Sequence, residues 1–239
     1  MFHHTHAYLA AQIYENDNPL IQLGAILPDI ASTGIISGNE GLHGVEYDQK
    51  FKEFILAKYP DYKDLSNGVH AHNIVDDISH LEYKGKIGFA YQNNKELSAL
   101  IETFYQLDQE HSKNIAHVYI ESGVDIFILK DMPEIQTKLR LAINQIDKQK
   151  VSKILSEYFR KDPAKFYEAL TNFLELFTKY NFTEHEKWNP FWHDLEKIMK
   201  LKNIGEGKRM QLLNKSMEIT KYSHKEFMTY VKAVGPSKL

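Results

Sequence analysis

The chain has 239 residues, of which 43% are hydrophobic and 26% are charged, and these proportions exclude an intrinsically disordered protein. The formal net charge is −3, so no overall positive charge favours a nucleic-acid partner. Cysteine is absent from the sequence, which excludes disulfides and thiolate metal ligands, so any transition metal must be bound by nitrogen and oxygen.

The sequence predicts an all-α protein, because apolar residues recur every three or four positions and the alternation typical of half-buried strands is hard to find. Prolines stand at or near the ends of the expected helices, where a missing N–H group costs little. The expected helices are 4–16, 46–58, 65–83, 94–130, 134–147, 150–160, 163–180, 184–202 and 206–232. Residues 16–44 are rich in Gly and Pro and form the longest irregular segment, and such loops are often functional.

We expect one domain over residues 1–239, with a metal-binding core over 1–150 and a helical extension over 151–239. The extension is expected because Lys, Phe, Tyr and Trp become more frequent near residue 150. The residues from Met1 onward show neither the basic nor the apolar region of a signal peptide, and no apolar run approaches the ~18 residues of a membrane span. We therefore expect a soluble, cytoplasmic protein.

The first candidate motif is His72, Asp76 and His80, which follow one another at four-residue steps. On an α-helix each such step turns the side chain by only ~40°, so all three would lie along one face and reach a common site. Val69 and Tyr83 continue the same stripe, which suggests a buried face. Buried charge is costly unless it is paired or bound to metal. The alternative is a hydrogen-bonded helix that faces solvent.

The second candidate motif is His117, Glu121 and Asp125, again at four-residue steps. Its neighbours are apolar, so the helix is expected to be buried nearly all round. The neighbours are Val118, Ile120, Val124, Ile126 and Ile128. A His and a Glu one turn apart on a core helix can bind a metal at two points. The alternative is an ordinary surface pair.

Three further candidates lie upstream, namely His6, Asp29 and His43. Asp29 and His43 fall in or beside the Gly/Pro-rich segment, where the backbone can bend to direct a carboxylate into a cleft. Alternatively, Asp29 is a turn or helix-cap carboxylate after Pro28, and the two histidines are ordinary core or surface residues.

In chain order, this set resembles the ligand series of the bacterial zinc-dependent phospholipase C family, whose helical fold is shared more distantly by the S1/P1 nucleases. The matching motifs are Thr5-His6-Ala7, Leu23-Gly24-Ala25-Ile26-Leu27-Pro28-Asp29, His43, His72-xxx-Asp76, His80 and His117-xxx-Glu121. The resemblance covers residues 3–125 and implies a multi-helix bundle with a metal cluster in a central cleft.

The resemblance implies two to three zinc ions, with iron, manganese or nickel as alternatives. It implies that Asp29, His43, His72 and Asp76 serve one ion, and that Asp76 is shared with an ion that also takes His6. A further ion would be held by His80, His117 and Glu121. The resemblance also leaves open that Asp29 is the catalytic general base.

The chain departs from the family pattern in two respects. Secreted members use the processed N-terminal residue as a ligand, whereas this chain begins with Met1, so the third ion is expected to be weak or absent. The step from Asp76 to His80 is one helical turn, which is tighter than in the secreted lipases. The chain thus resembles an intracellular branch of the family.

The activity we expect is metal-dependent hydrolysis of phosphoric esters, including diesters, by a phospholipase C-like enzyme. Two divalent ions ~3.5–4 Å apart can bind both non-bridging oxygens of the ester, lower the pKa of a bridging water toward ~7 and stabilise the leaving oxygen. The expected substrates are small phosphate esters or phospholipid head groups.

Two other functions remain open. One is a nuclease or nucleotide phosphohydrolase with aromatic residues that stack on bases; the candidates are Tyr47, Phe51, Tyr59, Tyr62 and Tyr83. The other is a non-catalytic protein in which the metal staples helices together.

In the C-terminal third, Trp188, Phe191 and Trp192 stand among several lysines. They predict either a basic amphipathic helix that touches a lipid surface or an ordinary helix packed on the core.

Overall fold

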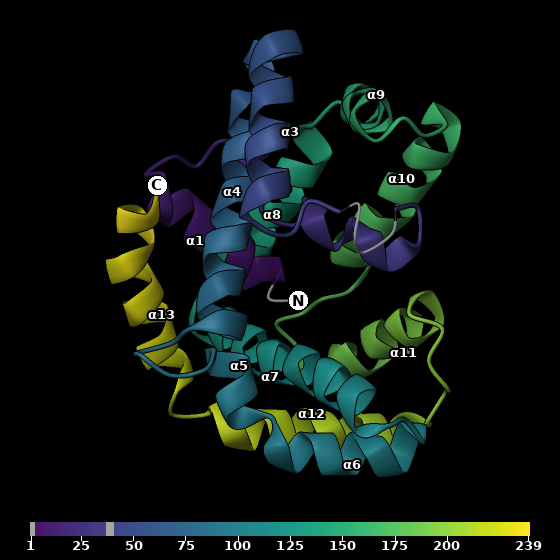
Figure 1. Cartoon of the computed structure of the whole chain (residues 1–239). Helices are drawn as coiled ribbons and strands as arrows, with labels where there is room; N and C mark the ends of the chain where they lie inside the picture. Colours follow the sequence, from purple (N-terminus) through teal and green to yellow (C-terminus); the bar gives the residue numbers. More distant parts are fainter. Residues whose placement is uncertain (1–2, 37–40) are drawn as a thin grey trace. The chain divides into compact units, whose positions relative to one another are not determined.

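Figure 1 shows the computed structural model of the chain, which describes residues 3–36 and 41–239, with residue 45 described by its backbone alone. These residues are predominantly helical and contain no strand, only an isolated bridge between Tyr83 and Lys86. The all-α prediction is therefore confirmed. Among the described residues, no helix is both long enough and sufficiently apolar to cross a lipid bilayer. Met1 lies outside the described residues.

The chain forms two compact units, and each unit is assembled from separate stretches of sequence. Unit 1 contains residues 3–5, 75–134 and 180–239, and unit 2 contains residues 6–36, 41–74 and 135–179. The shift in composition near residue 150 therefore does not coincide with a boundary between the units.

Unit 1 is built around helix α7, Gln109–Asp131, whose buried residues lie on all sides of the helix, as the sequence predicts. Four helices pack against it: α5 (Phe89–Asn93), α6 (Lys95–Tyr105), α12 (Glu206–Thr220) and α13 (His224–Val234). The other elements are the π-helical turn η4 (Asp77–Leu81), the 3-10 turns η5 (His185–Lys187) and η6 (Gly235–Lys238), and α11 (Trp188–Ile198).

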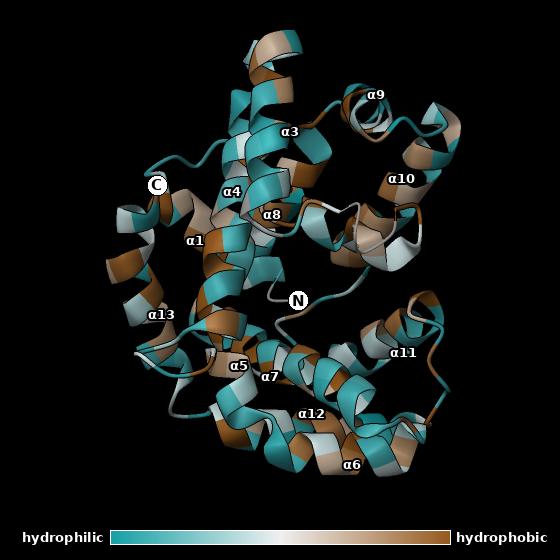
Figure 2. Cartoon of the chain, viewed as in Figure 1, coloured by the Kyte–Doolittle hydropathy of each residue, from teal (hydrophilic) through white to brown (hydrophobic). Residues whose placement is uncertain are grey.

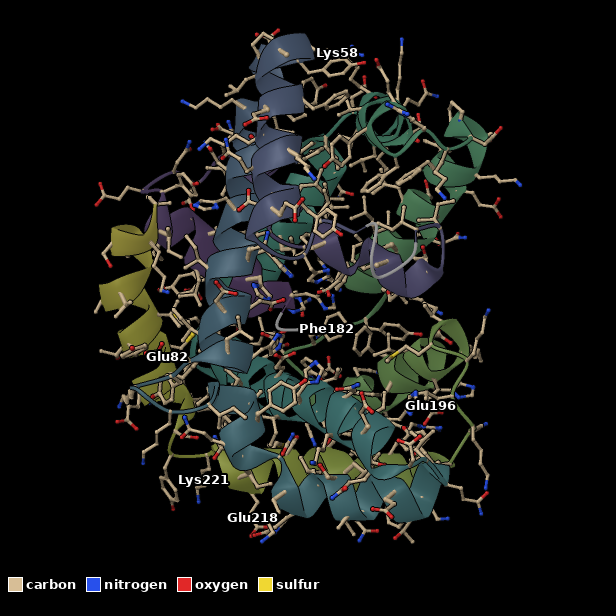
Figure 3. The ribbon with its side chains drawn as sticks, in the orientation of Figure 1. Lys58, Glu82, Phe182, Glu196, Glu218 and Lys221 are labelled. Carbon is tan, nitrogen blue, oxygen red and sulfur yellow. The ribbon has the colours of Figure 1, made fainter. Side chains whose placement is uncertain are left out.

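The aromatic residues of α11 are buried in unit 1. Trp192 is fully buried and stacks on Tyr119 of α7 with ring centroids 3.7 Å apart. Glu196, labelled in Figure 3, accepts hydrogen bonds from Tyr105 and from the guanidinium of Arg209, each over 2.8 Å. Of the two predictions for this segment, the packed helix is confirmed and the lipid-facing one is wrong.

Unit 2 contains α2 (Pro19–Gly24), the 3-10 turns η1 (Leu27–Thr33) and η3 (Pro60–Tyr62), α3 (Val45–Lys58), α9 (Lys148–Phe159) and α10 (Pro163–Lys179). Most of α1 (His3–Ile13), α4 (Lys63–Asp76) and α8 (Glu134–Gln145) also belongs to it.

Figure 2 shows polar and apolar residues alternating around the helices, as expected for amphipathic helices that pack by one face.

The structure corrects the sequence prediction of a continuous helix over 94–130. Helix α6 ends at Tyr105 because Gln106 adopts a left-handed backbone with φ of 61°. Helix α7 then begins where the Asp108 side chain accepts a hydrogen bond from the His111 N–H.

Other expected elements also differ. The helix expected over 206–232 is two helices, separated by a turn in which the Ser223 N–H donates to the Thr220 carbonyl. Within the segment 16–44, expected to be irregular, α2 and η1 form, each with a proline in its first turn.

Candidate metal centre

His72 lies on α4 in unit 2 and is 1% exposed. Its Nδ1 donates a hydrogen bond to the carbonyl oxygen of Ala25 over 2.8 Å. Because a carbonyl can only accept, the neutral imidazole carries its proton on Nδ1 and keeps the lone pair on Nε2. Metal-binding histidines are commonly oriented by such a bond from the second ring nitrogen.

Two glycines allow Ala25 to come this close to α4. A Cβ on Gly24 would lie 2.2 Å from the Leu65 carbonyl oxygen, and one on Gly68 would lie 2.2 Å from the Ile21 carbonyl oxygen. The backbones of α2 and α4 therefore touch one residue before Ala25 and one turn before His72. Any larger side chain at either position would separate the carbonyl from the imidazole.

Asp29 and His43 lie in the Gly/Pro-rich segment that the sequence identified as functional. The Oδ1 atom of Asp29 is 3.6 Å from Nε2 of His43. Their side chains are 15% and 36% exposed, so this pair is open to solvent whereas His72 is not. Asp29 lies in the first turn of the 3-10 element η1, whose N-cap is Ile26, so the turn position expected for Asp29 is confirmed and the helix-cap alternative is wrong.

The neighbour of His72 fixes the loop that carries His43. The amide of Asn73 donates to the Leu42 carbonyl over 3.0 Å and accepts from the Gly44 N–H over 2.9 Å. Both hydrogen bonds flank His43, so α4 holds the loop on either side of this histidine.

Asp29, His43 and His72 can each offer one ligand atom, and these atoms lie within 4.8 Å of one another. We call these residues the first triad. The His43 ring meets the His72 ring edge-on at 5.0 Å, and the His6 ring stacks on His72 at 4.0 Å. The structure thus brings four of the eight predicted ligands together in unit 2.

A second group lies in unit 1 and contains His80, His117 and Glu121, whose ligand atoms also lie within 4.8 Å of one another. We call these residues the second triad. His117 and Glu121 lie one turn apart on α7, and His80 lies on η4. Glu121 is fully buried, so the alternative of an ordinary surface pair for His117 and Glu121 is wrong.

Hydrogen bonds converge on the buried carboxylate of Glu121. Its Oε1 accepts from Nε2 of His80 over 2.7 Å and from Oγ of Ser79 over 3.0 Å. Asp76, the last residue of α4, has its carboxylate 3.8 Å from Nδ1 of His80. His80 is thus held between two carboxylates.

These charges set the protonation of the second triad. Burial disfavours a charge on His80, but the carboxylates of Asp76 and Glu121 outweigh it and raise the pKa of His80 to about 9. Burial lowers the pKa of His117 to about 4. Burial would raise the pKa of Glu121, yet nearby positive charge, including that of His80, lowers it. At neutral pH one imidazole is charged and the other is neutral.

The chain reaches His80 through a π-helical turn, whereas the sequence predicted an α-helix over 65–83. The α-helix ends at Asp76, so His80 does not follow His72 at the α-helical angle. A Cβ on Gly88 would lie 2.2 Å from the His80 carbonyl carbon and 2.3 Å from the Ser79 carbonyl oxygen. The backbone at Gly88 therefore packs tightly against the turn that carries His80.

Asp125, the third residue of the second motif, has a structural role. Its carboxylate accepts hydrogen bonds from the N–H groups of His4 and Thr5 over 3.2 and 3.0 Å, and from the Thr5 hydroxyl over 2.5 Å. It therefore satisfies the first N–H groups of α1. Phe182, labelled in Figure 3, packs on the His4 ring at 4.8 Å.

The sequence did not identify several residues that support the triads. Asn73 and the Ala25 carbonyl lie within the motifs that were noted, but their roles depend on tertiary contacts. Tyr91 has a ring that contacts both histidines of the second triad, but the spacing of residues in the sequence does not indicate this contact.

Of the aromatic residues expected to stack on bases, Phe51 and Tyr83 are buried in the core.

No family model, curated protein or solved structure matches this chain.

Proposed function

We propose that this protein is a metal-dependent hydrolase of phosphoric esters that acts through the first triad. The observation that carries the proposal is the convergence of Asp29, His43 and His72, with ligand atoms within 4.8 Å of one another, in a partly open position. The motif resemblance to the zinc-dependent phospholipase C family supports the same function.

The first triad fits a transition-metal ion in its chemistry. Its donors are two imidazoles and one carboxylate, which suit zinc and also iron, manganese or nickel. The hydrogen bond to Ala25 uses Nδ1 of His72, so Nε2 is the ring nitrogen that would bind such an ion. Three protein ligands and an exposed side match a catalytic site, because such sites keep a position for water.

When bound, a divalent ion would lower the pKa of a water molecule toward ~7 and polarise a phosphoryl oxygen. The protein's own groups do the rest. His72 is rigid, because it is buried and bonded to Ala25. Asp29 is near enough to solvent and to His43 to serve as a ligand or as the base that takes a proton from the attacking water.

The second triad favours a second candidate role, which is a structural metal site. Glu121 is fully buried, and its carboxylate joins the π-turn η4 to the core helix α7. An ion held there would cross-link two elements in the way structural sites do. This role is compatible with catalysis at the first triad.

The direct test combines metal analysis with hydrolysis. Protein prepared without chelator is analysed for zinc, iron, manganese and nickel, and is then assayed with bis-p-nitrophenyl phosphate. We expect bound metal, activity that a chelator removes, and in His72→Ala the loss of activity together with the metal bound at the first triad. The control is His111→Ala, since that side chain is 69% exposed and belongs to neither triad. Protein with no metal and no hydrolysis would refute the proposal.

A further assay separates the substrate classes. If phospholipid head groups are the substrates, a phosphocholine ester should inhibit the hydrolysis of bis-p-nitrophenyl phosphate more strongly than a nucleotide does. The reverse result would favour the nuclease or nucleotide phosphohydrolase alternative.

A further inference from the structure

Tyr91 lies beside the second triad without being one of its candidate ligands. It is on the short helix α5, which packs against both η4 and α7, the two elements that carry His80 and His117. Its side chain is half-buried. All of these elements belong to unit 1.

The ring of Tyr91 contacts both imidazoles. It meets the His80 ring edge-on, with centroids 5.9 Å apart and an interplanar angle of 77°, and lies tilted on the His117 ring at 5.4 Å. The two imidazoles meet each other at 4.8 Å and 67°. The three rings therefore form one cluster in which each ring restricts the rotation of the other two.

This cluster matters most for His117. In the first triad, His72 is oriented by a hydrogen bond to a carbonyl, which is the usual arrangement for a metal-binding histidine. In His117 the Nδ1 atom is buried and has no hydrogen-bond partner within the described part of the chain. Ring packing therefore contributes to its orientation, and the rings of Tyr91 and His80 both pack on it.

The hydroxyl of Tyr91 points to a different partner. It donates a long hydrogen bond of 3.3 Å to Oδ1 of Asn114, an exposed residue of α7. A hydrogen bond of this length contributes little, so the ring contacts carry most of the effect.

We propose that Tyr91 is a positioning residue of the second triad, whose ring holds His80 and His117 in the orientation that presents their nitrogens to an ion. The inference depends on the metal-binding capacity given to this triad under Proposed function. The aromatic ring of Tyr91, without its hydroxyl, is expected to be sufficient for the effect on metal affinity.

The experiment measures the zinc affinity of the full-length protein by competition with a chromophoric chelator. A His72→Ala background disables the first triad, so that the second triad is measured alone. Into this background we introduce Tyr91→Ala, Tyr91→Leu and Tyr91→Phe. Tyr222→Ala is the matched control, because Tyr222 is 82% exposed and also lies in unit 1. Thermal unfolding of each metal-free variant is recorded in parallel.

We expect Tyr91→Ala and Tyr91→Leu to weaken zinc binding about 10- to 100-fold, as loss of an orienting partner does elsewhere. Tyr91→Phe is expected to restore affinity to within about threefold of the background, since it keeps the ring. Where Tyr91→Ala proves unfolded, the bulkier Tyr91→Leu decides the result.

Three results would overturn the inference. Affinity unchanged in the folded Ala or Leu variant would show that the ring positions nothing. An equal loss in Tyr91→Phe would show that the hydroxyl, and not the ring, is responsible. If the His72→Ala background itself bound no zinc, the second triad would not be a metal site, and the inference would fail for that reason. This result is distinguishable from the first two, in which the background binds zinc.

Discussion

The imidazole of His72 donates a hydrogen bond to the backbone carbonyl of Ala25 over 2.8 Å, across 47 residues of sequence. This one bond links the segment after α2 to α4. It also fixes which ring nitrogen of His72 faces the other two members of the first triad. In the second triad, the hydrogen bonds that Glu121 accepts from Ser79 and His80 play the corresponding role.

Gly68→Ala tests the close approach that makes the bond to Ala25 possible. The new Cβ would lie 2.2 Å from the Ile21 carbonyl oxygen, and backbone atoms there cannot move aside easily. We expect a loss of about 2 kcal/mol or more in the free energy of unfolding, together with weaker metal binding. The control is Gly207→Ala on α12, where nothing lies within 4 Å. Urea unfolding of both variants checks the difference, and equal stability would contradict the explanation.

Asp29→Asn separates a catalytic from a structural role for the first triad. Asn keeps the size and shape of the Asp29 side chain, which is 15% exposed, so the free energy of unfolding should change little. Hydrolysis should fall by about 10²- to 10⁴-fold, the usual effect of removing a general base. Asp61→Asn, an exposed residue in the same unit, is the control. A variant that retained activity but lost stability would favour the structural role.

Zinc binding at the second triad should depend on pH through His80. In the protein without metal the pKa of His80 is about 9, whereas that of His117 is about 4, so at pH 7 only His80 must lose a proton to bind zinc. Apparent affinity should rise about tenfold per pH unit and level off above pH 9. Titrations on the His72→Ala background at several pH values measure the slope. A flat profile between neutral pH and pH 9 would contradict this protonation.

Glu121→Gln should lower the pKa of His80, because it removes one of the two carboxylates that raise it. NMR titration of the His80 ring in metal-free protein measures the change. Since the raised pKa of His80 lies above its unfolded value, the stabilisation is present below about pH 6.5 and is lost as the pH rises through about 9. This loss should be smaller in Glu121→Gln, and it should be unchanged in Asp108→Asn, whose carboxylate accepts hydrogen bonds from the exposed His111 and not from His80.

The sequence predicted the helical class because the three-and-four spacing of apolar residues is a local property. It also identified His117 and Glu121, since both residues lie on one α-helix and the spacing alone brings them together. It was wrong that His80 continues the α-helical face of His72 and Asp76, because a π-turn changes the angle after Asp76, and nothing in residues 77–81 signals that turn. The contact of Gly24 with Gly68 and the ring packing of Tyr91 depend on helices that approach from elsewhere in the chain, which periodicity does not report.

The most direct test of the two metal sites is anomalous X-ray scattering at the zinc, iron, manganese and nickel edges from crystals of protein prepared without chelator. We expect one anomalous peak bounded by Asp29, His43 and His72, and another bounded by His80, His117 and Glu121. The element whose edge gives the peaks would identify the metal at each site. Crystals that diffract well and show no anomalous peak at either triad would contradict the account.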